Sequence, residues 1–192
     1  VHGAPLTKEG SLKAKEFFNW YHPDFYIPSE VRDFYKDSYI ARGLLAYMKF
    51  NKDVDKLEEE DRVALDNIIT MEVVNNVKGK IPTYIEGHNN ATRNVSGELL
   101  NVYSQYSDIL FGGSADVAGS VKTSLKNKET FTCDNYAGQN IHFGIREHAM
   151  CAIANGIAAH GGLRPYVGSF LVFSDYAKGA LRCASLMGLP VT

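Results

Sequence analysis

The sequence predicts an α/β fold in which helices cover both faces of a parallel sheet. The first observation is that short apolar segments alternate with longer helical patterns in the second half of the chain. Such alternation is typical of parallel, helix-covered sheets. The second is the composition: the 192 residues are 45% hydrophobic and 22% charged, which is ordinary for a globular protein and long enough to bury a core.

The first half of the chain is expected to contain helices and connectors but no sheet. Residues 1–37 mix prolines with scattered aromatic residues, a pattern that indicates a tail or strap lying on another surface. Two helices are predicted, over 38–52 and 58–76, and the second begins with four acidic residues that favour a helix start. Residues 79–87, with a proline among them, are predicted to be a connector.

The second half carries the α/β pattern. The expected strands are 108–111, 140–144, 165–172 and the beginning of a fourth at Pro190. The expected helices are 90–106, 146–160 and 174–186. Ligands bind to sheets of this kind beyond the carboxyl ends of the strands. The segments expected at that edge are 112–120, 144–148 and 170–176.

Composition also narrows the classes of function. A net charge of −2, with acids and bases spread along the chain, argues against nucleic acid as a partner. Three widely spaced cysteines without a CxxC pair indicate free thiols in a reducing compartment, so a cytoplasmic location is expected. No apolar run reaches about 18 residues, and no membrane segment or signal peptide is expected. Both ends of the chain are expected to be cut from something longer.

Several side chains fall where the predicted sheet would hold a ligand. Glu147 opens a helix directly after a strand, a position where a carboxylate is commonly placed for the helix dipole alone. Phe170, Phe173 and Tyr176 fall at the end of the next strand and the start of its helix, where they could bracket a flat heterocycle or simply pack in the core. Cys151, one turn beyond Glu147, is predicted to be a small buried residue.

These segments together resemble a known family. The matching segments are 141–150, 154–157, 160–162 and 170–176, with 112–116 as a further match. They resemble the pyrimidine-binding domain of transketolase, and residues 2–6 resemble the end of its preceding, diphosphate-binding domain. The resemblance implies three parts: a tail of that preceding domain over 1–37, a helical connecting segment over 38–88, and a pyrimidine-binding α/β domain over 89–192 that is truncated at its C-terminal end.

The resemblance implies thiamine diphosphate as the cofactor and a role for Glu147. In the family, a glutamate hydrogen-bonded to N1′ of the aminopyrimidine stabilises the tautomer whose 4′-imino nitrogen takes the C2 proton of the thiazolium ring. By the same match, Phe170 and Phe173 pack on the pyrimidine ring, Tyr176 lies alongside it, and Ile145 lines the pocket.

Four other residues match functional residues of the family, and two of them also have an ordinary structural explanation. Asp116 matches an aspartate near the cofactor and donor substrate, or it caps the turn after a strand. Arg93 and Ser120 match residues that grip the sugar phosphate, although Arg93 also fits a solvated helix position. The family often has Pro-Ser-Asn where this chain has Gly-Ser-Val over 119–121, which leaves the shape of that loop open. His2 matches a histidine near the cofactor diphosphate.

The implied activity is transfer of a two-carbon ketol unit from a ketose phosphate to an aldose phosphate. The family implies sugar phosphates as substrates, a homodimer with active sites between subunits, and Mg²⁺ or Ca²⁺ bound by the missing preceding domain. The fragment alone is therefore expected to be inactive. Three alternatives stay open: a dihydroxyacetone synthase, a deoxyxylulose phosphate synthase, and a noncatalytic assembly module with the same fold.

Overall fold

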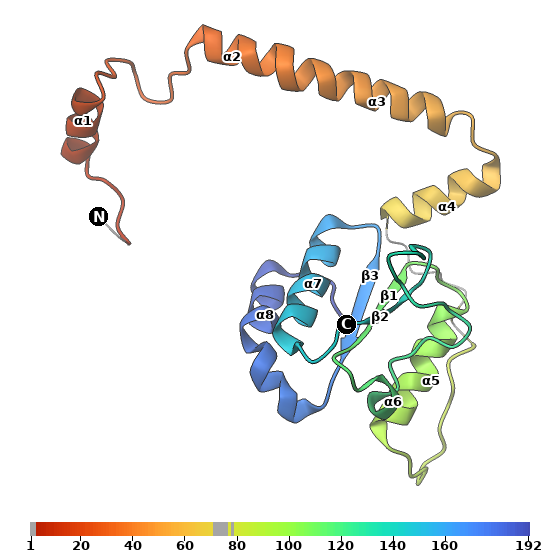
Figure 1. Ribbon diagram of the computed structural model, residues 1–192. Helices are drawn as coiled ribbons and strands as arrows, with labels where there is room; N and C mark the ends of the chain where they lie inside the picture. Colours follow the sequence, from red (N-terminus) through yellow and green to blue (C-terminus); the bar gives the residue numbers. More distant parts are fainter. Residues whose placement is uncertain (1–2, 71–76, 78) are drawn as a thin grey trace. The chain divides into compact units, whose positions relative to one another are not determined.

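The computed structural model of the chain describes residues 3–70, 77 and 79–192. The chain divides into two compact units, Val1–Leu57 and Glu58–Thr192 (Figure 1). The sheet and every predicted site residue except His2 belong to the second unit. His2 lies outside the described residues.

The first unit is helical. Its elements are α1 (Lys8–Phe17), α2 (Ser29–Tyr35), the π-helix η1 (Lys36–Ile40) and α3 (Ala41–Val54). The last three follow one another without a break, so the helix expected over 38–52 is confirmed but begins earlier. Within residues 1–37, for which the sequence predicted a tail or strap, α1 and α2 are helical, and the Thr7 hydroxyl accepts a hydrogen bond from the amide of Gly10 and so caps α1.

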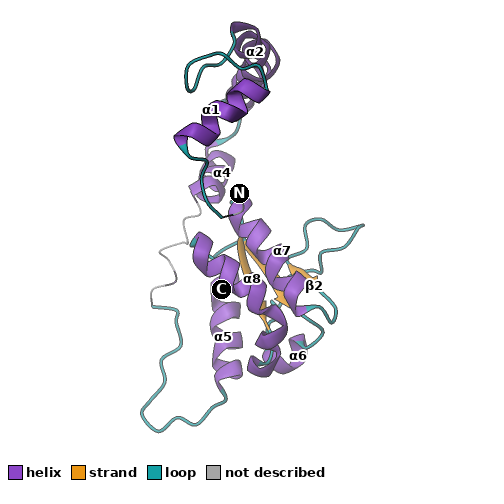
Figure 2. Cartoon of the chain, turned by 90° about the vertical axis from the view of Figure 1, so that its left-hand side faces the viewer, coloured by secondary structure: helices purple, strands orange, loops and turns teal. Residues whose placement is uncertain are grey.

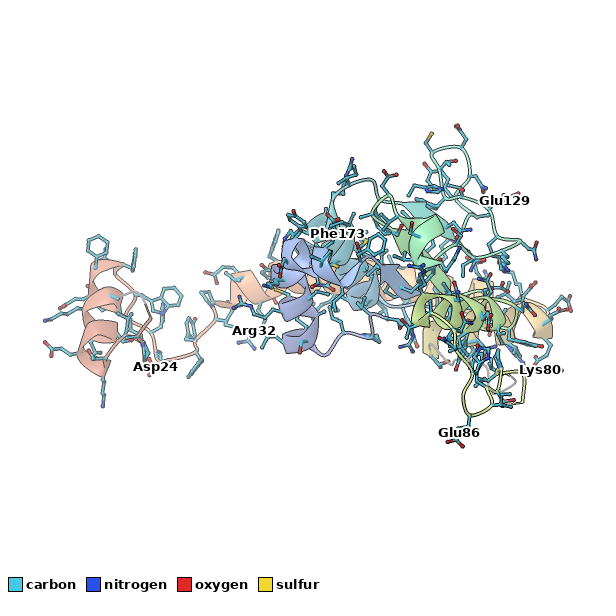
Figure 3. The ribbon with its side chains drawn as sticks, turned by 90° about the horizontal axis from the view of Figure 1, so that it is seen from below. Asp24, Arg32, Lys80, Glu86, Glu129 and Phe173 are labelled. Atoms are coloured by element: carbon cyan, nitrogen blue, oxygen red, sulfur yellow. The ribbon has the colours of Figure 1, made fainter. Side chains whose placement is uncertain are left out.

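No residue in the described helices of this unit is buried. The turn after α1 is held by an ion pair between Lys15 and Asp24, the second of which is labelled in Figure 3. The guanidinium of Arg42 lies 5.5 Å from the centre of the Tyr39 ring. Exposed contacts of this kind contribute little to stability.

The second unit begins with α4 (Glu59–Thr70), which starts one residue later than predicted, so its first turn carries three of the four acidic residues expected at the helix start. The end of that predicted helix, 71–76, lies outside the described residues. Residues 79–87 form turns and loop, in agreement with the predicted connector. Among the residues described, no helix is both long and apolar enough to cross a membrane.

The sheet is parallel, and its three strands are β1 (Leu110–Ser114), β2 (Asn140–His142) and β3 (Arg164–Gly168). Their order is β2-β1-β3, and Gly113 of the central strand pairs with Ile141 on one side and Val167 on the other. The predicted α/β fold with a parallel sheet is confirmed. Thr192 donates to the carbonyl of Pro165 at 3.1 Å and accepts from the amide of Val167 at 2.9 Å, so only this residue of the predicted fourth strand pairs with β3.

Two strand boundaries differ from the prediction. The strand predicted over 165–172 ends at Gly168, because its partner strand ends at Ser114, directly opposite. Without a ladder to join, the chain turns at once into the 3₁₀-helix η3 (Leu171–Phe173). The strand predicted over 108–111 is instead Leu110–Ser114, so the glycines expected after the strand lie inside it.

Helices cover both faces of the sheet, as predicted. In Figure 1, α7 (Glu147–His160) and α8 (Ser174–Met187) lie on one side of the strands, while α5 (Thr92–Ser104) and α6 (Ala118–Val121) lie on the other. From the side, α7 and α8 stand in front of the strands (Figure 2). The buried core lies under α7 and α8 and consists of Ala115, Phe143, Met150, Cys151, Ala177 and Ala180, with Ile141 and Val167 packed against it.

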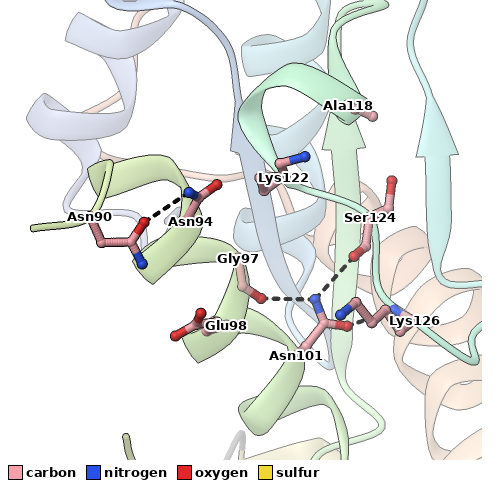
Figure 4. Close-up of a pocket in the computed structure, with 10 residues that line it drawn as sticks. Asn90, Asn94, Gly97, Glu98, Asn101, Ala118, Lys122, Ser124 and Lys126 are labelled. Carbon is pink, nitrogen blue, oxygen red and sulfur yellow. Dashed lines mark hydrogen bonds between the residues drawn. The ribbon is translucent and has the colours of Figure 1, made fainter. Parts of the chain in front are cut away.

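Side-chain amides fix the long loop between β1 and β2. The Asn140 amide group donates to the carbonyls of Leu125 and Lys128, at 3.0 and 2.8 Å, and its oxygen accepts from the amide of Leu125 at 2.8 Å. Asn101 on α5 donates to the carbonyl of Ser124 and accepts from the amide of Lys126 (Figure 4). These bonds give a loop with little regular structure a fixed path to the edge of the sheet.

Candidate functional site

The carboxyl ends of the three strands meet at one edge of the sheet, where ligands bind in folds of this kind. Asp116 follows β1, Glu147 follows β2, and Phe170 follows β3. Each is reached within five residues of the end of its strand. Strand direction alone therefore brings side chains that are 54 positions apart in the sequence, Asp116 and Phe170 (170 − 116), to the same edge.

Glu147 is placed by a tight turn between β2 and α7. Gly144 has a φ of +69°, which a residue with a side chain seldom adopts, and its carbonyl accepts from the amide of Arg146 at 2.9 Å. The helix then begins at Glu147, which is partly buried. A carboxylate in the first helical turn is stabilised by the unpaired backbone amides there. The turn thus sets one acidic group at the ligand edge of the sheet.

Glu147 shares a cavity of about 200 Å³ with two of the predicted aromatic residues. Phe170 and Phe173 meet edge to face, with ring centres 5.7 Å apart and planes at 85°. Phe173 is labelled in Figure 3, in the C-terminal part of the ribbon. The other residues of the lining are Met150, Cys151, Val167, Ser169, Leu171, Ser174, Ala177 and Leu181. One carboxyl group against an otherwise mostly apolar wall suits a flat ring that carries a hydrogen-bonding nitrogen.

Three predicted cofactor residues lie at the same edge but outside the lining of this cavity. Ile145 is 80% exposed, and Tyr176 is 68% exposed with its ring 6.3 Å from that of Phe173. Asp116 is exposed and adopts a φ of +64°, a conformation that aspartate tolerates better than most residues. The structure therefore brings Glu147 and the two phenylalanines together and leaves these three side chains open to solvent.

Arg93 lines a second cavity, of about 550 Å³, next to the first. The two cavities share the wall formed by Val167, Ser169, Phe170 and Leu171. Arg93 is exposed near the start of α5. Ser120 is exposed on α6 and lines neither of these two cavities. Arg93 and the phenylalanine wall are thus neighbours, although 77 positions (170 − 93) separate Arg93 from Phe170.

Two lining residues were given no role at the site by the sequence. Cys151, predicted to be a small buried residue, is only 5% exposed and also lines the cavity of Glu147, one helical turn away. Burial raises the pKa of its thiol, and the charge of Glu147 raises it further. Ser169 follows β3 directly. Two signals in the sequence could have indicated that these residues line the site. Cys151 lies four residues after Glu147 on the same predicted helix, and Ser169 lies at the carboxyl end of a predicted strand.

Two further features define what the site lacks and what lies beside it. The described residues contain no group of three or more histidine, cysteine, aspartate or glutamate side chains that could hold a metal ion.

A separate polar cavity of about 420 Å³ lies between α5, α6 and the loop after α6 (Figure 4). Lys122 and Lys126 line it from the loop, and Glu98, whose carboxylate accepts from the Tyr84 hydroxyl at 2.6 Å, lines it from α5.

Comparison with known proteins identifies the domain that carries this site. Residues 88–192 match the family described as the transketolase, pyrimidine binding domain. The chain belongs to this family. The resemblance to transketolase predicted from the sequence is therefore confirmed, and the parallel sheet with Glu147 at its ligand edge is the fold of a transketolase pyrimidine-binding domain.

Relatives in sequence and in structure agree with this assignment. The chain is 44% identical to the transketolase of Bacillus subtilis and 40% identical to that of Geobacillus stearothermophilus, over its whole length in both cases. It spans 29% of the length of each of these relatives. A crystal structure of transketolase from Campylobacter jejuni covers 99% of this chain with 28% of its own, at 35% identity and a TM-score of 0.77.

The structural match extends to a substrate complex. The transketolase of Pichia stipitis in complex with sedoheptulose-7-phosphate covers 100% of this chain with 30% of its own. The identity is 31% and the TM-score is 0.85.

Proposed function

We propose that this chain is the pyrimidine-binding part of a thiamine-diphosphate-dependent transketolase, which transfers a two-carbon ketol unit from a ketose phosphate to an aldose phosphate. The observation that carries the proposal is the cavity in which Glu147 meets Phe170 and Phe173, in a domain of the transketolase family. A conserved fold alone would not indicate an activity, because one fold hosts many functions. The acidic group and the aromatic wall are what a cofactor ring requires.

The residues of the cavity fit the aminopyrimidine ring of thiamine diphosphate. About 200 Å³ is room for one ring, and it is less than the roughly 300–1,000 Å³ of pockets that enclose a whole ligand. Phe170 and Phe173, whose rings are nearly perpendicular, would contact the cofactor ring and exclude water from it. Glu147 would hold a proton between its carboxylate oxygen and a ring nitrogen. When bound, thiamine diphosphate supplies the carbanion chemistry, and the protein supplies position and electrostatics.

The neighbouring cavity supports a role for Arg93 in binding the phosphate of the substrate. A guanidinium group can meet phosphate oxygens with two parallel hydrogen bonds. Arg93 lines a cavity of about 550 Å³ that shares a wall with the cavity of Glu147, so a substrate held there would lie next to the cofactor ring. Transketolases from Pichia stipitis that this chain matches have been solved with fructose-6-phosphate and sedoheptulose-7-phosphate. We propose sugar phosphates of this kind as substrates here.

Further parts of the proposal rest on family membership. We propose that Asp116, Tyr176 and Ile145 approach the cofactor in the complete enzyme, and that Ser120 contributes to the phosphate site. We propose a homodimer, Mg²⁺ or Ca²⁺ held with the cofactor diphosphate by another domain, a cytoplasmic location, and a place in the pentose phosphate pathway. His2 would lie near that diphosphate.

Substitution of Glu147 by glutamine in the complete enzyme tests the proposal. The amide keeps the size of the side chain but cannot hold the shared proton, so turnover should fall about a hundredfold or more. Glu86→Gln, at an exposed position before α5, is the matched control and should leave turnover unchanged. Circular dichroism and a thermal melt should show both variants folded. A folded Glu147→Gln enzyme with near-normal ketol transfer would refute the assignment.

A further inference from the structure

Helices α7 and α8, which form two walls of the cavity of Glu147, pack against each other on one face of the sheet (Figures 1 and 2). Glu147 is the first residue of α7, and Phe173 directly precedes α8. The other residues that these two helices contribute to the lining are Met150, Cys151, Ser174, Ala177 and Leu181. The first turns of two helices therefore bound the cavity, and its width depends on how those helices are placed relative to each other.

The buried side chains of α7 and α8 are mostly small. Apart from Met150, they are Cys151, Ala154, Ala158, Ala177 and Ala180. Alanine has no side-chain rotamers and forms only a low ridge on a helix, so alanines let two helices approach closely but interlock little along the helix axis. In coiled coils, a single buried asparagine can specify the register that apolar side chains leave open. A directional polar contact is therefore the feature that can fix α8 along α7.

Asn155 of α7 makes such a contact. Its partly buried side-chain amide donates to the carbonyl of Ala180, in the middle of α8, at 2.8 Å. A backbone carbonyl has two lone pairs, so this carbonyl can accept from Asn155 and still pair within its own helix. A second contact lies closer to the cavity: a Cβ atom on Gly179 would come within 3.2 Å of Cε1 of His148, so the glycine lets the histidine ring lie against α8. The ring contact brings the helices together, and the hydrogen bond gives them a direction-specific position.

The hydrogen bond lies about two helical turns from the cavity on both helices. Asn155 follows Glu147 by eight residues (155 − 147), and with Cys151 halfway between them all three lie on one face of α7. Ala180 follows Phe173 by seven residues (180 − 173). Because a helix of two turns moves as a unit, a bond that fixes the helices at this level also fixes the walls of the cavity that they carry.

We propose that Asn155 is a positioning residue that fixes α8 relative to α7 and thereby sets the width of the cavity of Glu147 for the ring bound there. The nature of that ring rests on the proposed function, whereas the fixed position of the two helices does not. Asn155 does not itself line the cavity. It acts on a bound ring only through the side chains that α7 and α8 carry.

Labelling of Cys151 in the ligand-free 192-residue chain reports on the position of the helices, because this buried thiol lies between Glu147 and Asn155 on α7. Asn155→Ala should let a maleimide label Cys151 about three- to tenfold faster than in the wild type, the effect of losing one ordinary hydrogen bond. Mass spectrometry of the peptides separates this thiol from the two exposed cysteines. Asn155→Asp keeps the volume of the side chain but replaces the donor with a charged acceptor, so it should label at least as fast as Asn155→Ala.

Asn101→Ala is the matched control for a general loss of stability. It removes three hydrogen bonds between a side-chain amide and the backbone, on α5 at the opposite face of the sheet. It should lower the midpoint of urea unfolding at least as much as Asn155→Ala and leave the labelling rate of Cys151 near that of the wild type. An equal increase of the rate in both variants would overturn the inference, and so would a wild-type rate in Asn155→Asp.

Binding of thiamine diphosphate to the complete enzyme tests the effect on the cavity. Isothermal titration in the presence of Mg²⁺ should show a Kd about three- to tenfold higher in Asn155→Ala and Asn155→Asp and unchanged in Asn101→Ala. Faster labelling of Cys151 with an unchanged Kd would overturn the inference and leave the proposed function intact. A wild-type complete enzyme that binds no thiamine diphosphate would instead refute the proposed function, and the labelling rates would still decide whether Asn155 fixes the helices.

Discussion

Substitution of Asn140 tests how the loop between β1 and β2 is held. This partly buried amide makes three hydrogen bonds, of 2.8, 3.0 and 2.8 Å, with the backbone of Leu125 and Lys128. A hydrogen bond contributes a net of about 0.5–1.5 kcal/mol, and backbone groups left unpaired add to the loss. Asn140→Ala should therefore lower the free energy of unfolding by about 2–4 kcal/mol.

Urea unfolding of the 192-residue chain, followed by circular dichroism, measures this loss as a lower midpoint at similar slope. Asn140→Asp keeps the shape and the oxygen that accepts from Leu125, but sets a charged oxygen against two carbonyls. It should destabilise the chain at least as much as alanine at pH 7. Gln105→Ala, at the exposed end of α5, is the control and should change the free energy by no more than about 0.5 kcal/mol. A loss below about 0.5 kcal/mol in Asn140→Ala would show that the loop is held by other contacts.

Two further predictions concern glycine and cysteine positions. Gly113→Ala should destabilise the chain by at least about 1–3 kcal/mol in urea unfolding, because its Cβ would come within 2.0 Å of the Ile141 carbonyl oxygen. Gly156→Ala, inside α7 where a Cβ meets no described atom within 4 Å, should instead stabilise the chain by about 0.5–1 kcal/mol. If both substitutions changed the free energy of unfolding by the same amount, the close contact at Gly113 would not be the cause of its loss. Since the pKa of the Cys151 thiol is raised, a thiol reagent should label it more slowly than the two exposed cysteines at pH 8, with its rate rising only at higher pH. Glu147→Gln should shift that rise toward lower pH, and an unshifted profile would exclude the charge of Glu147 as a cause.

The polar cavity beside α5 shows why the size of a hollow is weak evidence of function. At about 420 Å³ it is larger than the cavity of Glu147, and two lysines and one glutamate line it. Its amide groups are already engaged: two of the three bonds of Asn101 hold the loop after α6, and Asn90 pairs with Asn94 at 2.8 Å. The smaller cavity is the stronger candidate, because it combines one carboxyl group with a ring-sized apolar wall at the ligand edge of the sheet.

The sequence by itself determined the elements whose signals are local. The period of apolar residues and the flanking turn residues predicted α5, α7 and α8 within two residues at each end, and the alternation of elements predicted a parallel sheet. Local patterns also placed Glu147 at the start of a helix and Phe170 at the end of a strand, both at the edge where ligands bind, although β3 ends two residues before Phe170. The family resemblance followed from the same residues, because its motifs are short and continuous in the chain.

Only the tertiary structure decided which of these residues share a cavity. The strand order β2-β1-β3 sets β3 beside β1 and not beside β2, and the end of β1 at Ser114 stops β3 at Gly168. The chain therefore leaves the sheet after Gly168, two residues before Phe170. Phe170 then lines the same cavity as Glu147, whereas Asp116 stays exposed to solvent. Whether a side chain is buried, and what it meets there, depends on contacts between distant segments, and no local pattern encodes them.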